Sequence, residues 1–158
     1  MTRDKGYMEA KLFYKILDEL REHGTFIKVN GYGENLMHPC IEAFIIAIKK
    51  HNGLYFTSNC INLQIDTMET MIKNEVDVLQ ISFQGTNKED YEEQRKGASY
   101  NQLIHHIKEL VKRRGDANYP FIHMSTTVLD ETNQQIEDFI NICFDFGIDS
   151  VGIGRTDY

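Results

Sequence analysis

The sequence predicts an α/β protein built on one parallel sheet. Five segments rich in apolar and β-branched residues alternate with five segments of helical periodicity, and the strand segments are residues 26–29, 54–57, 76–83, 121–128 and 150–153. The connections are short, and a crossover helix is what returns a chain to begin the next strand in the same direction. No Pro- or Gly-rich linker divides the 158 residues, so a single domain is expected.

The winding of this sheet has two solutions, a doubly wound sheet and a barrel. The chain begins with a helical segment, as though a first strand were missing, and this favours a partial (β/α) barrel of the TIM type. In both solutions the loops that follow the strands open at one edge of the sheet, where functional groups are expected.

The first two helices are predicted from apolar spacing and from the residues that end them. Apolar residues at helical spacing occupy positions 8–20, and Gly24 suits a left-handed cap after them. The second apolar face lies at residues 41–48, with Pro39 expected in the first turn and Gly53 expected to close the helix.

Capping signals mark the remaining three helices. Asp66, Ser99 and Thr132 are each followed three residues later by Glu or Gln, which is the pattern of a capping box. Gly115 and Gly147 follow the last two apolar stripes and predict the ends of those helices. Five helices are therefore expected to alternate with five strands.

Composition disfavours several classes of function. The 17 Lys and Arg residues are outnumbered by 24 Asp and Glu residues, so the net charge is -7 and no nucleic acid partner is expected. No apolar run approaches the roughly 18 residues of a membrane span, and no signal-peptide core follows the N-terminus. Three widely separated cysteines fit reduced thiols better than a disulfide framework. A cytoplasmic protein is therefore expected.

The segment Asn-Gly-Tyr-Gly-Glu at residues 30–34 follows directly on the first strand. It lacks the third glycine of a dinucleotide-binding loop, and Glu34 would repel a pyrophosphate, so a dinucleotide site is disfavoured. Gly31 and Gly33 allow a ligand to approach the backbone, and the Glu34 carboxylate suits an ammonium group or another cation. The alternative is a tight turn in which Glu34 caps the next helix.

Several segments, taken in order, resemble the radical S-adenosylmethionine enzyme superfamily. The resemblance lies in GYGENLMHP at residues 31–39, TSNC at 57–60, ISFQG at 81–85, and then Tyr91 and Arg95 of YEEQR. In that family a glycine-glycine-glutamate motif, a Thr-Asn-Gly segment and a Ser-x-Asp-Gly segment with Tyr-x-x-x-Arg follow successive strands. The resemblance covers essentially the whole chain.

The resemblance implies a seat for the methionyl part of S-adenosylmethionine. Gly31, Gly33 and Glu34 would receive its amino group, which is the kind of cation that the loop chemistry also suggests. Arg95 would pair with the methionyl carboxylate in fork geometry. The alternative for Arg95 is a solvated surface pair with one of the nearby acids, which are Asp90, Glu92 and Glu93.

Four further residues complete the implied cofactor site. Asn59 and Ser82 would reach ribose or carboxylate oxygens, and their alternative role is that of turn or cap residues. Gly152 and Ile153 would lie against adenine through backbone and apolar contacts. Residue His123, in the strand at 121–128, is the histidine best placed to face this pocket.

The chain departs from the family pattern at single positions and at one whole motif. Tyr32 replaces a glycine, Asn35 stands where proline is usual, Cys60 replaces a glycine, and Gln84 replaces an aspartate. The C-x-x-x-C-x-x-C loop, whose thiolates hold the family's [4Fe-4S] cluster, is absent from residues 1–158. The three cysteines do not reproduce its spacing, so no metal ligand is assigned.

The resemblance implies that the parent enzyme cleaves S-adenosylmethionine reductively and uses the resulting 5'-deoxyadenosyl radical to take hydrogen from an unknown substrate. We expect residues 1–158 to be a single truncated radical SAM core domain, inactive alone, with no catalytic residue assigned. A [4Fe-4S] cluster and an electron donor are expected only in a full-length parent. The alternative is a non-catalytic binding or scaffold module that keeps the barrel fold.

Overall fold

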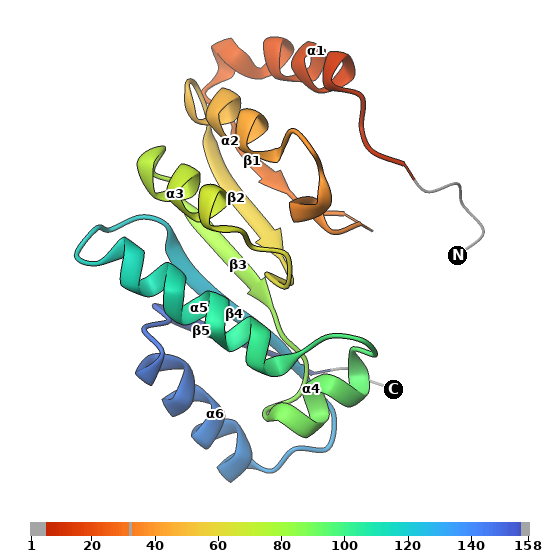
Figure 1. Ribbon diagram of the computed structural model, residues 1–158, viewed down its shortest axis with the longest axis vertical. Helices are drawn as coiled ribbons and strands as arrows, with labels where there is room; N and C mark the ends of the chain where they lie inside the picture. Colours follow the sequence, from red (N-terminus) through yellow and green to blue (C-terminus); the bar gives the residue numbers. More distant parts are fainter. Residues whose placement is uncertain (1–5, 32, 156–158) are drawn as a thin grey trace.

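The computed structural model describes residues 6–31 and 33–155, and it is built on a five-stranded sheet (Figure 1). The strands lie in the order β1-β2-β3-β4-β5, and every neighbouring pair is parallel. A doubly wound sheet reverses its strand order at a switch point, so this sequential order identifies the partial barrel of the TIM type. The strands are β1 (Phe26–Val29), β2 (Gly53–Ser58), β3 (Val78–Ser82), β4 (Phe121–Val128) and β5 (Ser150–Arg155).

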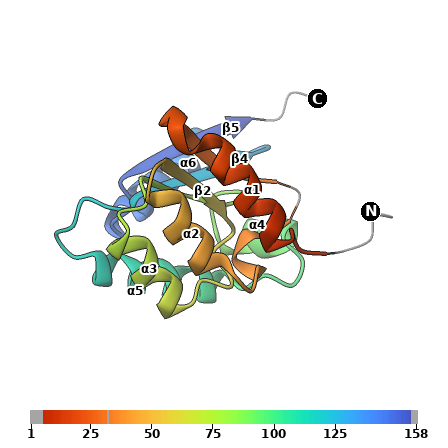
Figure 2. The same cartoon turned by 90° about the horizontal axis from the view of Figure 1, so that it is seen from above.

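The helices form a layer beside the sheet, with α2, α3 and α5 on the same side of the strands (Figure 2). Helix α2 lies next to α3, and α3 lies next to α5. None of the helices within the described residues is both long enough and apolar enough to cross a bilayer. The helices are α1 (Ala10–Leu20), α2 (Ile41–Lys49), α3 (Ile65–Lys73), α4 (Lys88–Gln94), α5 (Tyr100–Arg114) and α6 (Asn133–Asp145), with 3-10 turns at Arg21–His23 and Asn35–Met37.

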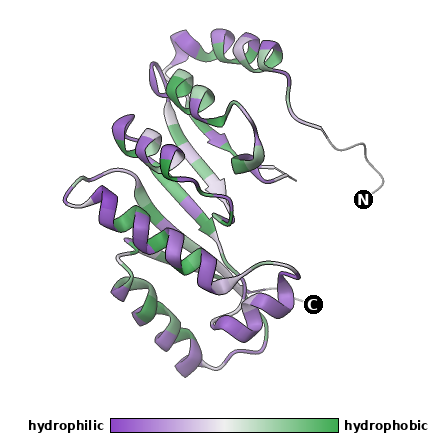
Figure 3. Cartoon of the chain, viewed as in Figure 1, coloured by the Kyte–Doolittle hydropathy of each residue, from purple (hydrophilic) through white to green (hydrophobic). Residues whose placement is uncertain are grey.

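The sheet has one buried and one open face. Helices α2, α3, α5 and α6 pack buried residues against alternate strand residues that are at most 1% exposed, which are Leu54, Phe56, Leu79, Ile81, Ile122 and Met124. The residues between them, Tyr55, Gln80 and His123, are only partly buried. Since helices cover the outside of a barrel, the open face is its concave interior. Figure 3 shows hydrophobic residues toward the sheet and an almost wholly hydrophilic α4.

Most of the predicted helix boundaries agree with the structure. Gly24 has φ 55° after the first helix, and Thr132 forms a capping box with Gln135. Asp66 does not cap α3 as expected, because the helix begins earlier, after Gln64. Asp66 therefore lies in the first turn, where a negative charge still favours the helix dipole.

Two features differ from the expected pattern. Gly53 is the first residue of β2 and does not close α2, because α2 ends near Lys49. Helix α4 is not predicted by the sequence pattern, since it has no apolar stripe. It is stabilised by the Asn87 side chain, which accepts a hydrogen bond from the Asp90 amide at 3.0 Å, and by the buried ring of Tyr91.

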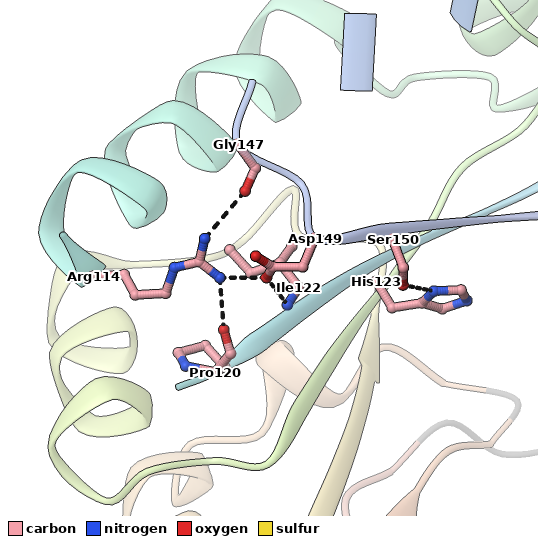
Figure 4. Close-up of polar contacts among 7 residues, drawn as sticks. All are labelled: Arg114, Pro120, Ile122, His123, Gly147, Asp149 and Ser150. Atoms are coloured by element: carbon pink, nitrogen blue, oxygen red, sulfur yellow. Dashed lines mark hydrogen bonds and ion pairs between the residues drawn. The ribbon is translucent and has the colours of Figure 1, made fainter. Parts of the chain in front are cut away.

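Asp149 fixes the start of β5 against β4. Its Oδ2 accepts a hydrogen bond from the Ile122 amide at 2.7 Å and pairs with the guanidinium of Arg114 at the end of α5 (Figure 4). Arg114 also donates to the carbonyls of Pro120 at 3.0 Å and Gly147 at 3.2 Å. One guanidinium therefore joins the end of α5 to the segments that lead into both strands.

Asp77 has the same role at the start of β3. Its Oδ2 accepts hydrogen bonds from the Leu54 amide at 2.7 Å and from Lys49 Nζ at 2.5 Å. In both cases an aspartate just before a strand binds the neighbouring strand's backbone and a basic residue from the end of a helix. These contacts set the strand register at the edge of the sheet opposite the functional loops.

We predict that Arg114→Met lowers the free energy of unfolding by about 2–4 kcal/mol, because it leaves a partly buried carboxylate and two carbonyls without their donor. Arg21→Met is the matched control, since the Arg21–Asp18 pair has side chains 54% and 64% exposed and is expected to contribute less than about 1 kcal/mol. Urea unfolding followed by circular dichroism measures both variants. Equal losses in the two variants would contradict the assigned role of Arg114.

Candidate S-adenosylmethionine site

An open pocket of about 430 Å³ lies at the carboxyl ends of β1, β2 and β3. Six of the eight predicted site residues line it together, namely Gly31, Gly33, Glu34, Asn59, Ser82 and Arg95. Three further residues complete its wall, which are Asn30, Thr57 and Ser58. The parallel sheet thus gathers residues from four separate segments of the chain at one edge.

Glu34 is the central acceptor of this pocket. Its Oε1 accepts hydrogen bonds from Ser58 Oγ at 2.6 Å and from the Leu36 amide at 3.1 Å, and its Oε2 accepts one from the Asn59 amide at 2.9 Å. The bond to Leu36 makes Glu34 the N-cap of the 3-10 turn Asn35–Met37, as the capping alternative predicted, although that alternative expected a longer helix. A carboxylate has about four acceptor positions, and Oε2 keeps one for a ligand cation.

The two glycines leave space beside this carboxylate. A Cβ atom added to Gly31 or to Gly33 would meet nothing within 4 Å. The turn therefore does not need glycine to avoid a clash within the described structure, and the open space suits close approach of a ligand to the backbone. Tyr32, which stands where the family has a glycine, lies outside the described residues.

Arg95 faces the pocket without an ion pair. Among the described residues it makes no salt bridge with Asp90, Glu92 or Glu93, the partners that the surface alternative requires. Its guanidinium lies 5.8 Å from the centroid of the Tyr91 ring, and its Nε is buried with no hydrogen-bond partner among those residues. A buried donor without a partner is costly, and the unpaired guanidinium charge beside the pocket suits an anionic ligand.

Asn59 and Ser82 occupy the pocket in different ways. The Asn59 side chain accepts a hydrogen bond from the Ile61 amide at 3.0 Å, so its carbonyl oxygen holds a turn and only its amide group is left for a ligand. Ser82 lies at the end of β3 on the concave face, in register with Ser125 on β4. Its hydroxyl has no hydrogen-bond partner within the described residues.

Gly152 and Ile153 do not line the pocket. Gly152 lies on β5, two strands away from Ser82 on β3, and it pairs with Ser125 on β4. A Cβ atom at Gly152 would lie 3.0 Å from the His123 ring. The described structure therefore gives Gly152 the role of making room for His123. Ile153 is partly buried and packs against the helix-covered core.

Two further residues hold the pocket together. Ser58 donates to Glu34 and accepts a hydrogen bond from the Cys60 amide at 2.8 Å. The Asn35 side-chain amide donates to the Thr57 carbonyl at 2.7 Å, which ties the loop after β1 to β2. Both residues lie within the segments that resemble the family, but the sequence does not show that they join the ends of β1 and β2. Their hydrogen bonds in the structure show this.

The cysteines do not suit an iron-sulfur cluster. The three cysteines lack the C-x-x-x-C-x-x-C spacing of the family's cluster loop. Burial raises the pKa of the Cys60 thiol and of the Cys143 thiol to about 12. Cys60 is fully buried at φ 56°, the position where the family has glycine. Among the described residues, no three His, Cys, Asp or Glu side chains gather closely enough to hold a metal ion.

We predict that only one of the three thiols reacts quickly with a disulfide reagent in the folded chain. At pH 8 a thiol with a pKa of about 12 is ionised to about one part in ten thousand, so Cys60 and Cys143 react slowly. Cys40 is only partly buried. The absorbance of the released thiolate gives the count, and Cys40→Ser should abolish the fast phase. Three fast thiols in folded protein would contradict this assignment.

Comparison with known proteins gives one family match and several similar structures. Residues 1–143 match the profile of the Radical SAM superfamily. SuiB from Streptococcus suis, bound to S-adenosylmethionine, has a TM-score of 0.80 and 17% identity over 99% of this chain and 36% of its own. Native anSMEcpe with bound AdoMet and Kp18Cys peptide has a TM-score of 0.70 and 11% identity over 97% of this chain and 44% of its own. No curated protein matches the sequence.

The structural likeness identifies the fold, and the profile identifies the family. SuiB bound to its precursor peptide SuiA is also similar, with a TM-score of 0.79 and 18% identity over 98% of this chain. The chain spans 34% of the length of that SuiB chain. With most of its residues matched by the family profile, the chain belongs to the radical S-adenosylmethionine superfamily.

Proposed function

We propose that the chain is the S-adenosylmethionine-binding portion of a radical S-adenosylmethionine enzyme. The observation that carries the proposal is that one open pocket is lined by two side chains of opposite charge, Glu34 and Arg95. The methionyl end of S-adenosylmethionine is itself a zwitterion, with an ammonium group beside a carboxylate. A carboxylate and a guanidinium on the same wall complement those two groups.

The residues present fit this cofactor. Glu34 Oε2 accepts only one hydrogen bond within the described structure and has room for an ammonium donor. Arg95 lines the pocket and makes no ion pair among the described residues, so its guanidinium is available to a carboxylate. The open space at Gly31 and Gly33 admits the methionyl chain close to the backbone.

The remaining residues would position the rest of the cofactor. The Ser82 hydroxyl and the Asn59 side-chain amide offer hydrogen bonds to ribose or carboxylate oxygens at the same edge of the sheet. With a reduced [4Fe-4S] cluster to donate an electron, bound S-adenosylmethionine would supply a 5'-deoxyadenosyl radical for hydrogen abstraction from a substrate. This chain's residues bind and orient the cofactor.

A second candidate is a non-catalytic binding module, which needs no cluster and is compatible with the finding that no three metal-ligating side chains gather among the described residues. Under this proposal the pocket keeps its affinity for the cofactor, and the chain does not assemble a cluster alone. A cytoplasmic location fits both candidates, because the three cysteines are free.

We predict that Glu34→Gln and Arg95→Met each weaken S-adenosylmethionine binding by about 10- to 100-fold, the loss expected for one charge-assisted hydrogen bond. Isothermal titration calorimetry measures the dissociation constant. Glu93→Gln removes an exposed carboxylate from the neighbouring helix and is the charge-matched control for Glu34→Gln. Circular dichroism verifies that each variant is folded. Unchanged affinity in both pocket variants would leave Glu34 as a cap only.

We also predict that anaerobic reconstitution with iron and sulfide gives no stoichiometric [4Fe-4S] absorbance in this chain, because its three cysteines lack the C-x-x-x-C-x-x-C spacing and no three ligating side chains gather among its described residues. A matched chain carrying an added C-x-x-x-C-x-x-C segment before residue 1 should bind a cluster if the chain belongs to an enzyme. A full cluster on the unmodified chain would refute the account of the cysteines. Failure of the extended chain would favour the binding module.

A further inference from the structure

The concave face of the sheet carries a row of polar side chains below the cofactor pocket. We call the residues Lys28, Tyr55, Gln80, His123 and Ser150 the polar row. They come from all five strands, one from each. Strand pairing places Lys28 beside Tyr55, Gln80 beside His123, and His123 beside Ser150. Between β2 and β3 the row shifts by two residues, because Tyr55 pairs with Val78. Lys28 is exposed and the other four are partly buried.

Contacts between side chains order this row. Lys28 Nζ lies 4.6 Å from the centroid of the Tyr55 ring, and Tyr55 donates a hydrogen bond to Gln80 Oε1 at 2.8 Å. His123 Nδ1 lies 2.7 Å from Ser150 Oγ, and Figure 4 shows the ring and the hydroxyl facing each other. The row is therefore preorganised, which lowers the entropy cost of binding a ligand.

The His123 ring keeps one nitrogen available. A Cβ atom on Gly152 would lie 3.0 Å from Nε2, so the ring occupies the space that this glycine leaves toward the cofactor edge. Nothing within residues 6–31 and 33–155 hydrogen-bonds Nε2. When Ser150 donates to Nδ1, Nε2 carries the proton and is a donor.

The charge of the concave face is one-sided. Its strand positions hold one cation, Lys28, and no carboxylate within the described strands. Burial, followed by the charge of Lys28, lowers the pKa of His123. The strands of the two residues are separated by two others, and the Tyr55–Gln80 hydrogen bond links the row between them. The net charge of the whole chain is -7, which makes a cationic interior a local feature.

We propose that the polar row binds an anionic oxygen group of the substrate, a carboxylate or a phosphate, with Lys28 supplying the charge and His123 Nε2 a directed hydrogen bond. The assignment of this anion to a substrate rests on the proposed function. If the pocket holds the cofactor, a group bound by the polar row lies on the concave face just below it, where a substrate would be. Tyr55 and Ser150 are positioning residues, since they hold Lys28 and His123 in place.

The test is an NMR titration of the whole chain, in which the His123 Cε1–Hε1 signal is followed while inorganic phosphate or acetate is added at constant ionic strength. We expect saturable shifts with at least one anion at millimolar concentrations. Lys28→Met should weaken binding by at least fivefold, and Lys73→Met, an exposed lysine on α3, should leave it unchanged. Shifts with acetate identify carboxylate recognition, and shifts with phosphate alone identify phosphate recognition.

No saturable shift with either anion, or equal affinity in the Lys28→Met and unsubstituted chains, would overturn the proposal. His123→Asn gives an independent check, because weaker phosphate or acetate binding is then measured at the Lys28 signals. Calorimetry of S-adenosylmethionine binding separates the two proposals. The Lys28→Met chain should bind S-adenosylmethionine as tightly as the unsubstituted chain. The Glu34→Gln chain should bind S-adenosylmethionine more weakly but should bind phosphate or acetate with unchanged affinity.

Discussion

Parallel pairing of five strands is the constraint on which the rest of the structure depends. Because all strands run in one direction, every carboxyl end reaches the same edge, and residues distant in the sequence meet in one pocket. Because side chains alternate along each strand, one face is buried under helices while the other carries the polar row. Asp77 and Asp149 hold the opposite edge in register, so the positions of the functional groups depend on contacts far from them.

Glu34 makes two kinds of contact in the structure. It caps a 3-10 turn through Leu36, and through Ser58 and Asn59 it joins the loop after β1 to the end of β2. These bonds fix the carboxylate before any ligand arrives, so binding would not have to order it. Arg95 is different, because its buried Nε has no partner within the described chain. Hydrogen bonds therefore hold the Glu34 carboxylate in place, whereas the Arg95 guanidinium still has a donor without an acceptor.

Local patterns predict the elements well, and long-range contacts explain what they miss. The cap at Thr132 and the left-handed Gly24 follow from a few neighbouring residues, and the structure has both. Helix α4 lacks an apolar stripe, so its cap and the buried Tyr91 ring are visible only in three dimensions. The packing of His123 over Gly152 likewise depends on the register of β4 against β5, which no local signal fixes.

The central claim is that the pocket at the ends of β1 to β3 holds S-adenosylmethionine, and amide NMR during a titration with the cofactor tests it most directly. Saturable shifts are predicted at the backbone amides of Gly31 and Asn59 and at Arg95 Nε, with little change at Gly115 on the opposite edge. S-Adenosylmethionine that shifts none of these signals, or that shifts only residues in the groove between α1 and α2, would contradict the claim.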